Sequence, residues 1–371
     1  MAKGSYFDTD EFYAASCARN FVKVSDIARN IAWTTVTEWG ELQITINLSK
    51  PEKDSRDIAA AAAKSLSSFD YQDPATGFMR PCPLCVTQAD VECGYARELP
   101  MGGEKWALWY SPYAYYNEHC IAMSWEHRPM HVDRTSFECL FDFVDLFPHY
   151  FIGSNTDLPI VGGSILGHDH FQGGRHMFPM QDAPVEEAFE LAGFSDVQAG
   201  IVKWPLSVVR LSGDDRNRIV AAAEHVLKAW VTYNDASVGI DSGFADGTVA
   251  QVDAAGHIAK VHNTVTPIVR KSGETYEMDI ALRCNITSAE HPLGVFHPHE
   301  ELHHIKKENI GLIEVMGLAI LPPRVRQAMD ERNLTRDDVG RAFAQVLEHA
   351  GVFKWDEPGR TAFGRFIDRC C

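Results

Sequence analysis

Short runs in which apolar and polar residues alternate occur along the chain, and this period of two is typical of half-buried strands. The clearest run is Leu42–Leu48, which ends at Ser49-Lys50-Pro51. An aromatic-rich stretch predicts two strands around a turn at Ser111-Pro112. The segments that predict strands are, in chain order, Leu42–Leu48, Trp106–Trp125, Tyr150–Ser154, Val202–Leu211 and Tyr276–Leu282.

Other segments have the spacing of helices. In Thr135–His149 the apolar residues recur on one side, so we expect an amphipathic helix with its N-cap at Thr135-Ser136 and its end at Pro148. A capping box over Leu334–Asp338 opens a further helix. The segments that predict helices are Ser5–Asn30, Asp57–Ser68, Thr135–His149, a start at Pro184–Glu187, Asp214–Asn234 and Val339–His349. Gly311–Leu321 is apolar, and we expect it to be buried.

Composition limits the class of protein. With 371 residues the chain is long enough for about two domains, and its net charge of −17 argues against a general binder of nucleic acid or of anionic membranes. No apolar run approaches the ~18 residues of a membrane helix. The N-terminus lacks the apolar segment of a secretion signal, and the nine cysteines are an odd number. We therefore expect a cytoplasmic protein with free or metal-bound thiols.

The stretch Pro159–Met180 is the most informative for chemistry. In extended backbone His168, His170 and Gln172 would point to one side, between glycine pairs that let a ligand approach the backbone. Arg175 follows and could grip a phosphate. The pattern favours a histidine that acts on a phosphate. A metal pair and two satisfied core histidines are alternatives.

A second motif, Cys82-Pro83-Leu84-Cys85, has the spacing of a zinc knuckle, although two small buried side chains in a turn would give the same pattern. A zinc site usually shows a second such pair, and this chain has none. Histidines would then complete it. The candidates are His127 and His168, with His119 and His131 as substitutes.

The C-terminal third contains a further group of histidines. His297-Pro298-His299 again places two imidazoles two residues apart. With His291 and an acid such as Glu186 they could hold a second metal, or they could form a wall facing an anionic substrate. Because His-x-His recurs in both halves, the chain could contain a duplicated unit. Asn155 lies in a turn where its side chain could cap the backbone or bind a sugar hydroxyl.

Several long runs resemble the galactose-1-phosphate uridylyltransferases of the type II branch, within the histidine-triad-like superfamily. The resemblance covers residues 20 to 330 and weakens beyond residue 330. Compared with typical members, we expect this chain to lack an N-terminal segment. The runs that carry it are Ile44–Asp54, Tyr110–Cys120, Glu126–Met130, Phe141–Gly174, His262–Pro267 and Glu290–Pro322.

The resemblance implies an α+β fold of two related histidine-triad-like halves, built on antiparallel sheets with flanking helices. We expect an N-terminal helical segment in residues 1–30 and a first half in residues 31–183 that carries the nucleophile and the zinc knuckle. A second half would occupy residues 184–330, and a helical tail residues 331–371.

The resemblance also implies a reaction: UDP-glucose and galactose 1-phosphate exchange a uridylyl group through a uridylyl-histidine. His170 would be the nucleophile, with Gln172 and backbone N–H groups near Gly163 and Ser164 as donors to the phosphate. The matching motif places Cys82, Cys85, His127 and His168 around a structural zinc. Asn155, Arg175, Lys306 and Lys307 would contact substrate. Glu186, His291, His297 and His299 would be the counterparts of a second metal site.

Two other functions stay open. One is a nucleotide hydrolase or phosphorylase of the same superfamily, and the other is a zinc-dependent nucleotide-binding protein without catalysis. The hydrolases usually carry a third alternating histidine, where this chain has Gln172 as the transferases do. We expect a homodimer whose partners are the nucleotide sugar and the hexose phosphate, with no nucleic acid and no membrane.

Overall fold

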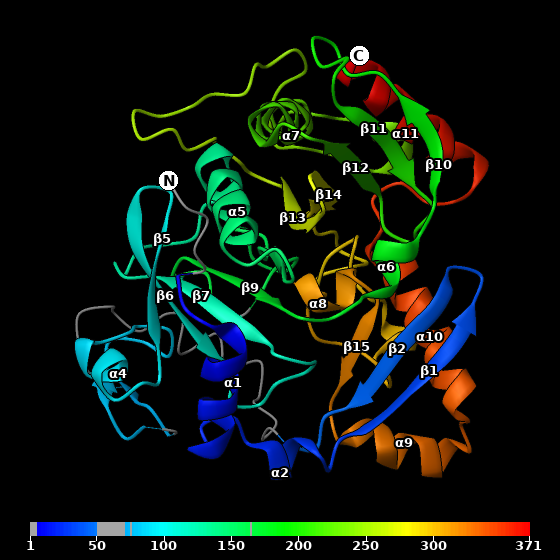
Figure 1. Cartoon of the computed structure of the whole chain (residues 1–371). Coiled ribbons are helices and arrows are strands. Elements are labelled where there is room, and N and C mark those ends of the chain that lie inside the picture. The colour runs from blue at the N-terminus through cyan, green and yellow to red at the C-terminus, as the bar shows by residue number, and fades with distance from the viewer. Residues whose placement is uncertain (1–5, 50–70, 75, 164) are drawn as a thin grey trace.

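A large antiparallel sheet dominates the structure, a computed structural model that describes residues 6–49, 71–74, 76–163 and 165–371 (Figure 1). Each strand in it runs antiparallel to its neighbours. The order across the sheet is β10 (Val185–Phe189), β11 (Gln198–Val202), β12 (Val208–Gly213), β14 (Thr275–Cys284), β13 (Asn263–Ser272), β8 (Phe151–Gly153), β9 (His170–Gly174), β7 (Cys120–Ser124), β6 (Glu104–Tyr110) and β5 (Arg97–Met101).

The sheet is assembled from hairpins and from one junction between distant segments. Strands β5 and β6 are joined by Gly102 and Gly103 alone, both with positive φ (60° and 73°), which suits the two-residue turn of a twisted hairpin. Strands β8 and β13 join the part of the sheet built from residues 97–174 to the part built from residues 185–284, through Val269 paired with Ile152 and Ile268 paired with Gly153.

Two long helices cover one face of the sheet. Helices α5 (Arg134–Leu146) and α7 (Arg216–Val231) lie side by side there, and their apolar residues join the largest buried cluster (Figure 1). The prediction of α5 is confirmed, but its cap is Asp133, whose carboxylate accepts the N–H groups of Thr135 and Ser136. The helix α11 (Glu357–Cys370) packs on α7.

A small sheet packs near the other face. It consists of β1 (Ile31–Thr37), β2 (Gly40–Ile46) and β15 (Leu318–Leu321), and β15 runs parallel to β2. Helix α10 (Arg336–Ala350) packs on it, and the predicted capping box between Thr335 and Asp338 is present. The remaining elements are short: α2 (Val24–Ile27), β3 (Tyr71–Gln72), β4 (Met79–Arg80), α4 (Gln88–Glu92), α6 (Pro179–Asp182), η1 (Ala236–Val238), η2 (Glu300–Leu302), α8 (Leu312–Val315) and α9 (Arg324–Arg332).

Several predicted elements differ from the observed ones. The helix expected over Ser5–Asn30 is α1 (Thr9–Ala18) followed by the single turn α2, because Asn20 takes a left-handed conformation between them. The strand expected over Val202–Leu211 is two strands, β11 and β12. The helix start expected at Pro184–Glu187 is wrong: these residues enter edge strand β10. The helix expected over Asp57–Ser68 lies outside the described residues.

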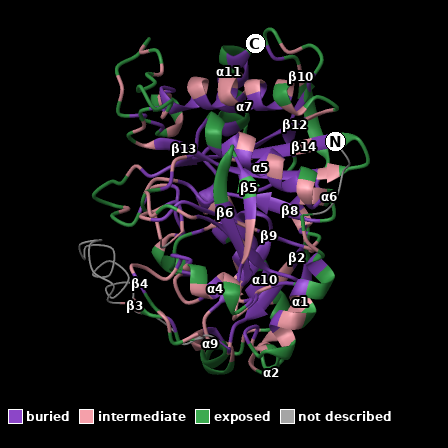
Figure 2. Ribbon diagram, turned by 60° about the vertical axis from the view of Figure 1, so that its left-hand side comes forward, coloured by how far each residue is buried: buried purple, intermediate pink, exposed green. Residues whose placement is uncertain are grey.

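Burial follows this layering. Figure 2 shows the buried residues running through the strands, while exposed residues lie on the outer turns of the helices and in the loops. Gly311–Leu321 is buried as expected, within α8 and β15. In the described part of the chain, no helix is both long and apolar enough to cross a membrane.

Candidate active site

Four side chains from three separate segments meet beside strand β9. Cys82 and Cys85 lie in the turn after β4, His127 follows β7, and His168 precedes β9. The Sγ atom of Cys82 lies 3.5 Å from that of Cys85 and 3.2 Å from Nδ1 of His168. The Sγ atom of Cys85 lies 3.2 Å from Nδ1 of His127 and 3.6 Å from Nδ1 of His168. These are the four residues expected to bind zinc from their spacing and from the family resemblance, and the fold brings them together.

The group has the donors and spacing of a tetrahedral metal site. With Zn–S near 2.3 Å and Zn–N near 2.0 Å, neighbouring ligand atoms of a tetrahedron would lie about 3.3–3.8 Å apart, close to the distances found here. The hydrogen bond between the two thiols lowers the pKa of Cys82 and raises the pKa of Cys85. The pair therefore already favours one thiolate, the form that binds metal. Cys2His2 is a donor set that holds zinc.

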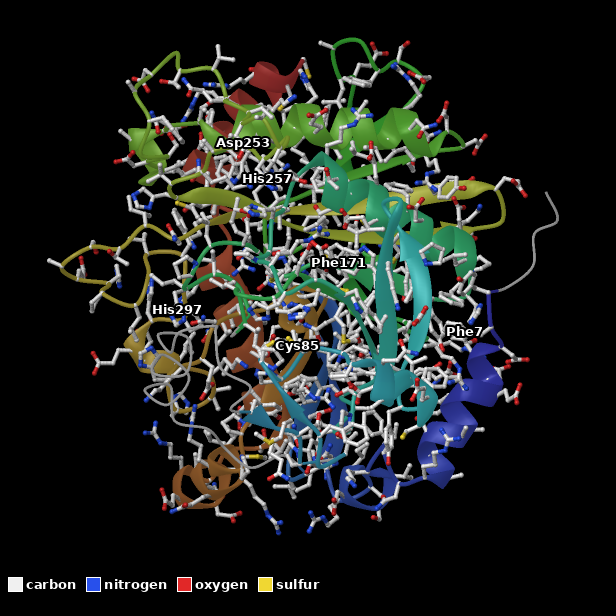
Figure 3. All side chains as sticks on the ribbon, turned by 90° about the vertical axis from the view of Figure 1, so that its left-hand side faces the viewer. Phe7, Cys85, Phe171, Asp253, His257 and His297 are labelled. Carbon is white, nitrogen blue, oxygen red and sulfur yellow. The ribbon has the colours of Figure 1, made fainter. Side chains whose placement is uncertain are left out.

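The two histidines named as substitute ligands lie elsewhere. The ring of His131 stacks on His257 with centroids 3.7 Å apart. Figure 3 shows His257 well apart from Cys85. His119 instead contacts Gln172, as described below. Among the described residues, the cysteine knuckle is therefore completed by His127 and His168.

A buried arginine contacts the turn that carries the two cysteines. The guanidinium of Arg80 is fully buried and donates to the carbonyl oxygen of Cys85 at 3.0 Å and to the carboxylate of Asp90 at 2.8 Å. The Cζ atom of Arg80 lies over the ring of Trp109, 5.2 Å from the ring centroid. Because a buried charge is costly unless paired, these contacts fix the turn that carries both cysteines.

A second ion pair joins the segments that carry the two histidines. The backbone N–H of Asp169 donates to the carbonyl oxygen of Arg128 at 2.8 Å, and Nε of Arg128 lies 3.3 Å from Oδ2 of Asp169. Burial raises the pKa of Asp169 to about 6, and Arg128 opposes that shift. Since these residues directly follow His127 and His168, the pair holds both ligand histidines in register.

His170 is the first residue of β9 and is almost fully buried. Its Nδ1 atom lies 2.7 Å from the carbonyl oxygen of His168. A carbonyl oxygen only accepts, so Nδ1 carries the proton and Nε2 of the neutral ring keeps its lone pair. Burial lowers the pKa of His170 to about 4, so the ring is neutral near pH 7. The arrangement leaves Nε2 as a nucleophile.

Gln172 lies two residues further along β9, on the same face of the strand as His170. Its Oε1 atom lies 3.0 Å from Nε2 of His119. The side chain is partly exposed. An amide beside a nucleophilic imidazole can donate to the non-bridging oxygens of a phosphate.

The glycine loop before β9 lies against Asn155 and the segment before α8. A Cβ atom at Gly163 would lie 2.8 Å from Nδ2 of Asn155, so that position needs glycine. Oδ1 of Asn155 accepts the N–H of Leu312 at 2.8 Å, and Nδ2 of Asn309 lies 3.4 Å from the carbonyl oxygen of Gly162. Asn155 therefore packs against Gly163 and caps the backbone at Leu312. Ser164 lies outside the described residues.

Two of the expected phosphate-binding cations are engaged in internal pairs. Arg175 pairs with Asp10 of α1 and with Glu118. Nζ of Lys306 is buried and donates to Oε1 of Glu314 at 2.7 Å and to the carbonyl oxygen of Ile320 at 3.0 Å. Lys307 is exposed. The first two side chains therefore stabilise the fold around the site.

The residues expected at a second metal site are not all neighbours. Glu186 lies on the exposed edge strand β10 and pairs with Arg360. His297, labelled in Figure 3, is buried, and its Nδ1 atom lies 3.2 Å from the carbonyl oxygen of Pro298. The rings of His291 and His299 stack with centroids 4.0 Å apart. Among the described residues, the group here that could hold a metal is His299, Glu301 and His349.

The chain is similar to known proteins over almost its whole length. The family model for the N-terminal domain of galactose-1-phosphate uridyl transferase matches residues 2–129, and the model for its C-terminal domain matches residues 143–347. The galactose-1-phosphate uridylyltransferase of Bacillus subtilis (strain 168) is 44% identical, over 97% of this chain and 76% of its own length. The chain belongs to the galactose-1-phosphate uridylyltransferase family.

Other members of this family of nucleotidyltransferases are similar to the chain to the same extent. The relatives from Streptococcus pneumoniae serotype 4 (44% identical, 78% of the relative covered) and Caldanaerobacter subterraneus (43%, 76%) also match 97% of this chain. The similarity is thus wider than the expected residues 20 to 330. The alignment with the Bacillus subtilis protein spans 411 positions, which is more than the chain's 371 residues, so that relative carries additional residues within it.

Solved structures of yeast Ap4A phosphorylase Apa2 are distant matches. The structure with Ap4A has a TM-score of 0.48 and 11% identity, over 92% of this chain and 95% of its own. A second structure of that protein has a TM-score of 0.47 and 10% identity, over 95% and 96%.

Sequence reasoning did not find some residues of this site. Arg80 immediately precedes the cysteine knuckle, but nothing in the pattern indicates that it is buried. Asp169 stands between the two histidines of the motif, and its pairing with Arg128 depends on how the strands meet. His349 lies in the helix that the capping box predicts, 50 residues from His299, and no local pattern relates the two. His119 was considered only as a spare zinc ligand.

Proposed function

We propose that this chain transfers a uridylyl group from UDP-glucose to galactose 1-phosphate, giving glucose 1-phosphate and UDP-galactose. Family membership supports the reaction type. The observation that carries the proposal is the hydrogen bond from Nδ1 of His170 to the carbonyl oxygen of His168, because it leaves Nε2 unprotonated at neutral pH.

In the first step Nε2 of His170 attacks the α-phosphorus of UDP-glucose. The bond from that phosphorus to the bridging oxygen breaks, its electrons stay on the oxygen, and glucose 1-phosphate leaves. The proton on Nδ1 remains in place, so the phosphorylated ring is cationic and still donates to His168. A phosphate monoester is a stable leaving group, so no strong general acid is needed.

In the second step a phosphate oxygen of galactose 1-phosphate attacks the same phosphorus. The nitrogen–phosphorus bond breaks, its electrons return to Nε2, and His170 is again neutral. In both steps Gln172 donates to a non-bridging oxygen of the transferring group, where charge develops.

We propose that Cys82, Cys85, His127 and His168 hold a structural zinc ion. The ion would neutralise the thiolates and fix the turn before β9, and it supplies no chemistry to the transfer. Its effect on His170 passes through the backbone of His168, which bears both the ligand ring and the accepting carbonyl.

A second metal ion remains a proposal, and His299, Glu301 and His349 offer better support for it than the set that includes Glu186. Counting metal ions per chain in the purified protein and in His349→Ala tests it. We expect the variant to lose the second ion and to keep zinc. An unchanged metal content would contradict the assignment.

Substrate contacts beyond the transferring phosphate are also proposals. We propose that the exposed Lys307 contacts the hexose phosphate and that two chains form a homodimer, as the resemblance implies. Sedimentation of the purified protein tests the second point, and a monomer would contradict it. A lower affinity for galactose 1-phosphate in Lys307→Met, with unchanged uridylylation by UDP-glucose, would support the first.

Incubation with UDP-glucose labelled in the α-phosphate tests the transfer itself. We expect a uridylyl adduct on His170 that is discharged by galactose 1-phosphate and is absent in His170→Ala. A matched control is His225→Ala, because His225 lies on α7 and contacts the carbonyl oxygen of Cys370. Release of free UMP without an adduct would instead indicate a hydrolase. Bound nucleotide with neither adduct nor turnover would indicate a binding protein.

A further inference from the structure

The side-chain amide of Gln172 has two ends with opposite hydrogen-bonding roles. Oε1 only accepts, and the Nε2 group only donates. An oxygen turned toward the phosphate would repel its anionic oxygens, whereas the NH2 group would stabilise them. The transfer therefore depends on which way the amide is turned, and the strand that carries Gln172 does not determine this.

His119 offers a means of fixing that orientation. Its Nε2 atom lies 3.0 Å from Oε1 of Gln172, and its Nδ1 atom lies 3.5 Å from the backbone nitrogen of Tyr115. A backbone N–H can only donate, so Nδ1 of His119 is the acceptor and carries no proton. In the neutral ring the proton then lies on Nε2, which donates to Oε1 of Gln172.

The ring of His119 is itself held in place. It is 2% exposed, and its centroid lies 4.4 Å from that of Tyr116 and 5.4 Å from that of Tyr115. Tyr116 in turn donates from its hydroxyl to the carbonyl oxygen of Gly173, next to Gln172. Ring position and ring tautomer are thus both tied to the backbone that surrounds strand β9.

We propose that His119 is a positioning residue that turns the NH2 group of Gln172 toward the transferring phosphate. This rests on the proposed uridylyl transfer. Oε1 of Gln172 is occupied by His119. No hydrogen bond from the Nε2 group of Gln172 is found within the described part of the chain. His119 acts through Gln172 and does not touch the substrate.

Two substitutions separate the donor from the ring. His119→Phe keeps a flat ring between the tyrosines and removes the N–H, whereas His119→Gln can return an amide N–H near the position of Nε2. Since loss of one oxyanion donor costs about 10²–10³-fold in rate, and a freely turning amide still donates part of the time, we expect His119→Phe to slow formation of the uridylyl-enzyme about 10- to 100-fold. The apparent affinity for UDP-glucose should change little. His119→Gln should recover most of the rate.

A double-mutant cycle distinguishes positioning from general structural support. In a Gln172→Ala background the substitution His119→Phe should have no further effect on the rate, because the group that it positions is gone. Independent, multiplicative losses would overturn the proposal. The matched control is His225→Phe, since Nε2 of His225 contacts a carbonyl oxygen, that of Cys370, at 2.8 Å, and His225 lies on α7. It should leave the rate unchanged.

A spectroscopic measurement decides the orientation without reference to activity. In protein labelled with 15N at histidine, the signals lost in His119→Phe identify the ring of His119. We expect an unprotonated Nδ1 and a protonated Nε2, and the reverse tautomer would overturn the proposal. If the wild-type protein forms no uridylyl adduct, the proposed function fails, and the spectrum still shows whether His119 donates to Gln172.

Discussion

The carbonyl oxygen of His168 accepts a hydrogen bond from Nδ1 of His170, 2.7 Å away, while the ring of His168 lies in the group with Cys82 and Cys85. One residue therefore contributes its side chain to the candidate metal site and its backbone to the nucleophile. Movement of the metal-binding turn would move the acceptor that fixes the tautomer of His170. The candidate metal site and Nε2 of His170 are thus linked through a single residue, with no contact between metal and substrate required.

The first prediction concerns pH. An ordinary histidine has a pKa of about 6.5, but burial lowers the pKa of His170 to about 4, so its neutral form persists well below pH 6. We expect the second-order rate constant for uridylyl-enzyme formation, measured at limiting UDP-glucose so that it reports the free enzyme, to stay constant between about pH 8 and pH 5.5. Single-turnover kinetics with UDP-glucose measure it, because this diphosphate diester has no group that titrates there.

The control for this profile is the metal content at each pH, since acid also releases zinc by protonating its ligands. A loss of rate centred near pH 6.5 in protein that retains its metal would show that His170 titrates normally. The buried, neutral imidazole would then be the wrong description of the free enzyme.

The second prediction concerns removal of the metal site. We expect Cys85→Ser to lower zinc affinity by more than about 100-fold. Loss of an outer-shell contact typically costs about 10- to 100-fold, and Cys85 would be a direct ligand. The melting temperature and the rate of uridylylation should fall together. Zinc titration and thermal unfolding measure the two effects. The matched control is Cys93→Ser, at an exposed cysteine, which should change neither.

The third prediction concerns the pair of Arg128 and Asp169. We expect Arg128→Met to lower the free energy of unfolding by about 1–3 kcal/mol, because it leaves the buried carboxylate of Asp169 without its partner. Glu104→Gln removes the other partner of Arg128, which is about half exposed, and should cost at most about 1 kcal/mol. Urea unfolding of both variants tests the ranking. A larger loss for Glu104→Gln would show that the pair with Asp169 does not stabilise the site.

Features that depend on neighbouring residues in the chain were predictable. The capping box of Thr335 and Asp338, the apolar stripe of α5 and the knuckle of Cys82 and Cys85 each depend on spacing within a few residues. The sequence alone also pointed to His168 and His170 as a functional pair. Local periodicity and ligand spacing are physical constraints that act without knowledge of the fold.

Features that depend on distant contacts were not predictable. Arg175 looked like a phosphate ligand because nothing in the sequence shows that Asp10, 165 residues away, would pair with it. Lys306 was expected to contact substrate together with Lys307, but it is buried against Glu314. A charged side chain takes the partner that the tertiary fold brings to it, and strand pairing determines which residues those are.

The last prediction concerns the stability of the protein in acid. Burial lowers the pKa of His297 to about 4, whereas in the unfolded chain it would be about 6.5. Below pH 6.5 the unfolded state binds the proton first, so stability is fully present above pH 6.5 and is lost as the pH falls toward 4. At pH 5 the contribution of His297 to this loss is about 2 kcal/mol, at 1.36 kcal/mol for each pKa unit.

We expect His297→Asn to be less stable than the wild type at pH 7.5, because it leaves a void in the core. The gap in the free energy of unfolding between the two proteins should narrow by about 2 kcal/mol at pH 5. Urea unfolding at both values measures the gap. His225→Asn, at a half-buried histidine on α7, is the control, and a gap that stays constant with pH would mean that His297 is protonated as easily in the folded protein as in the unfolded one.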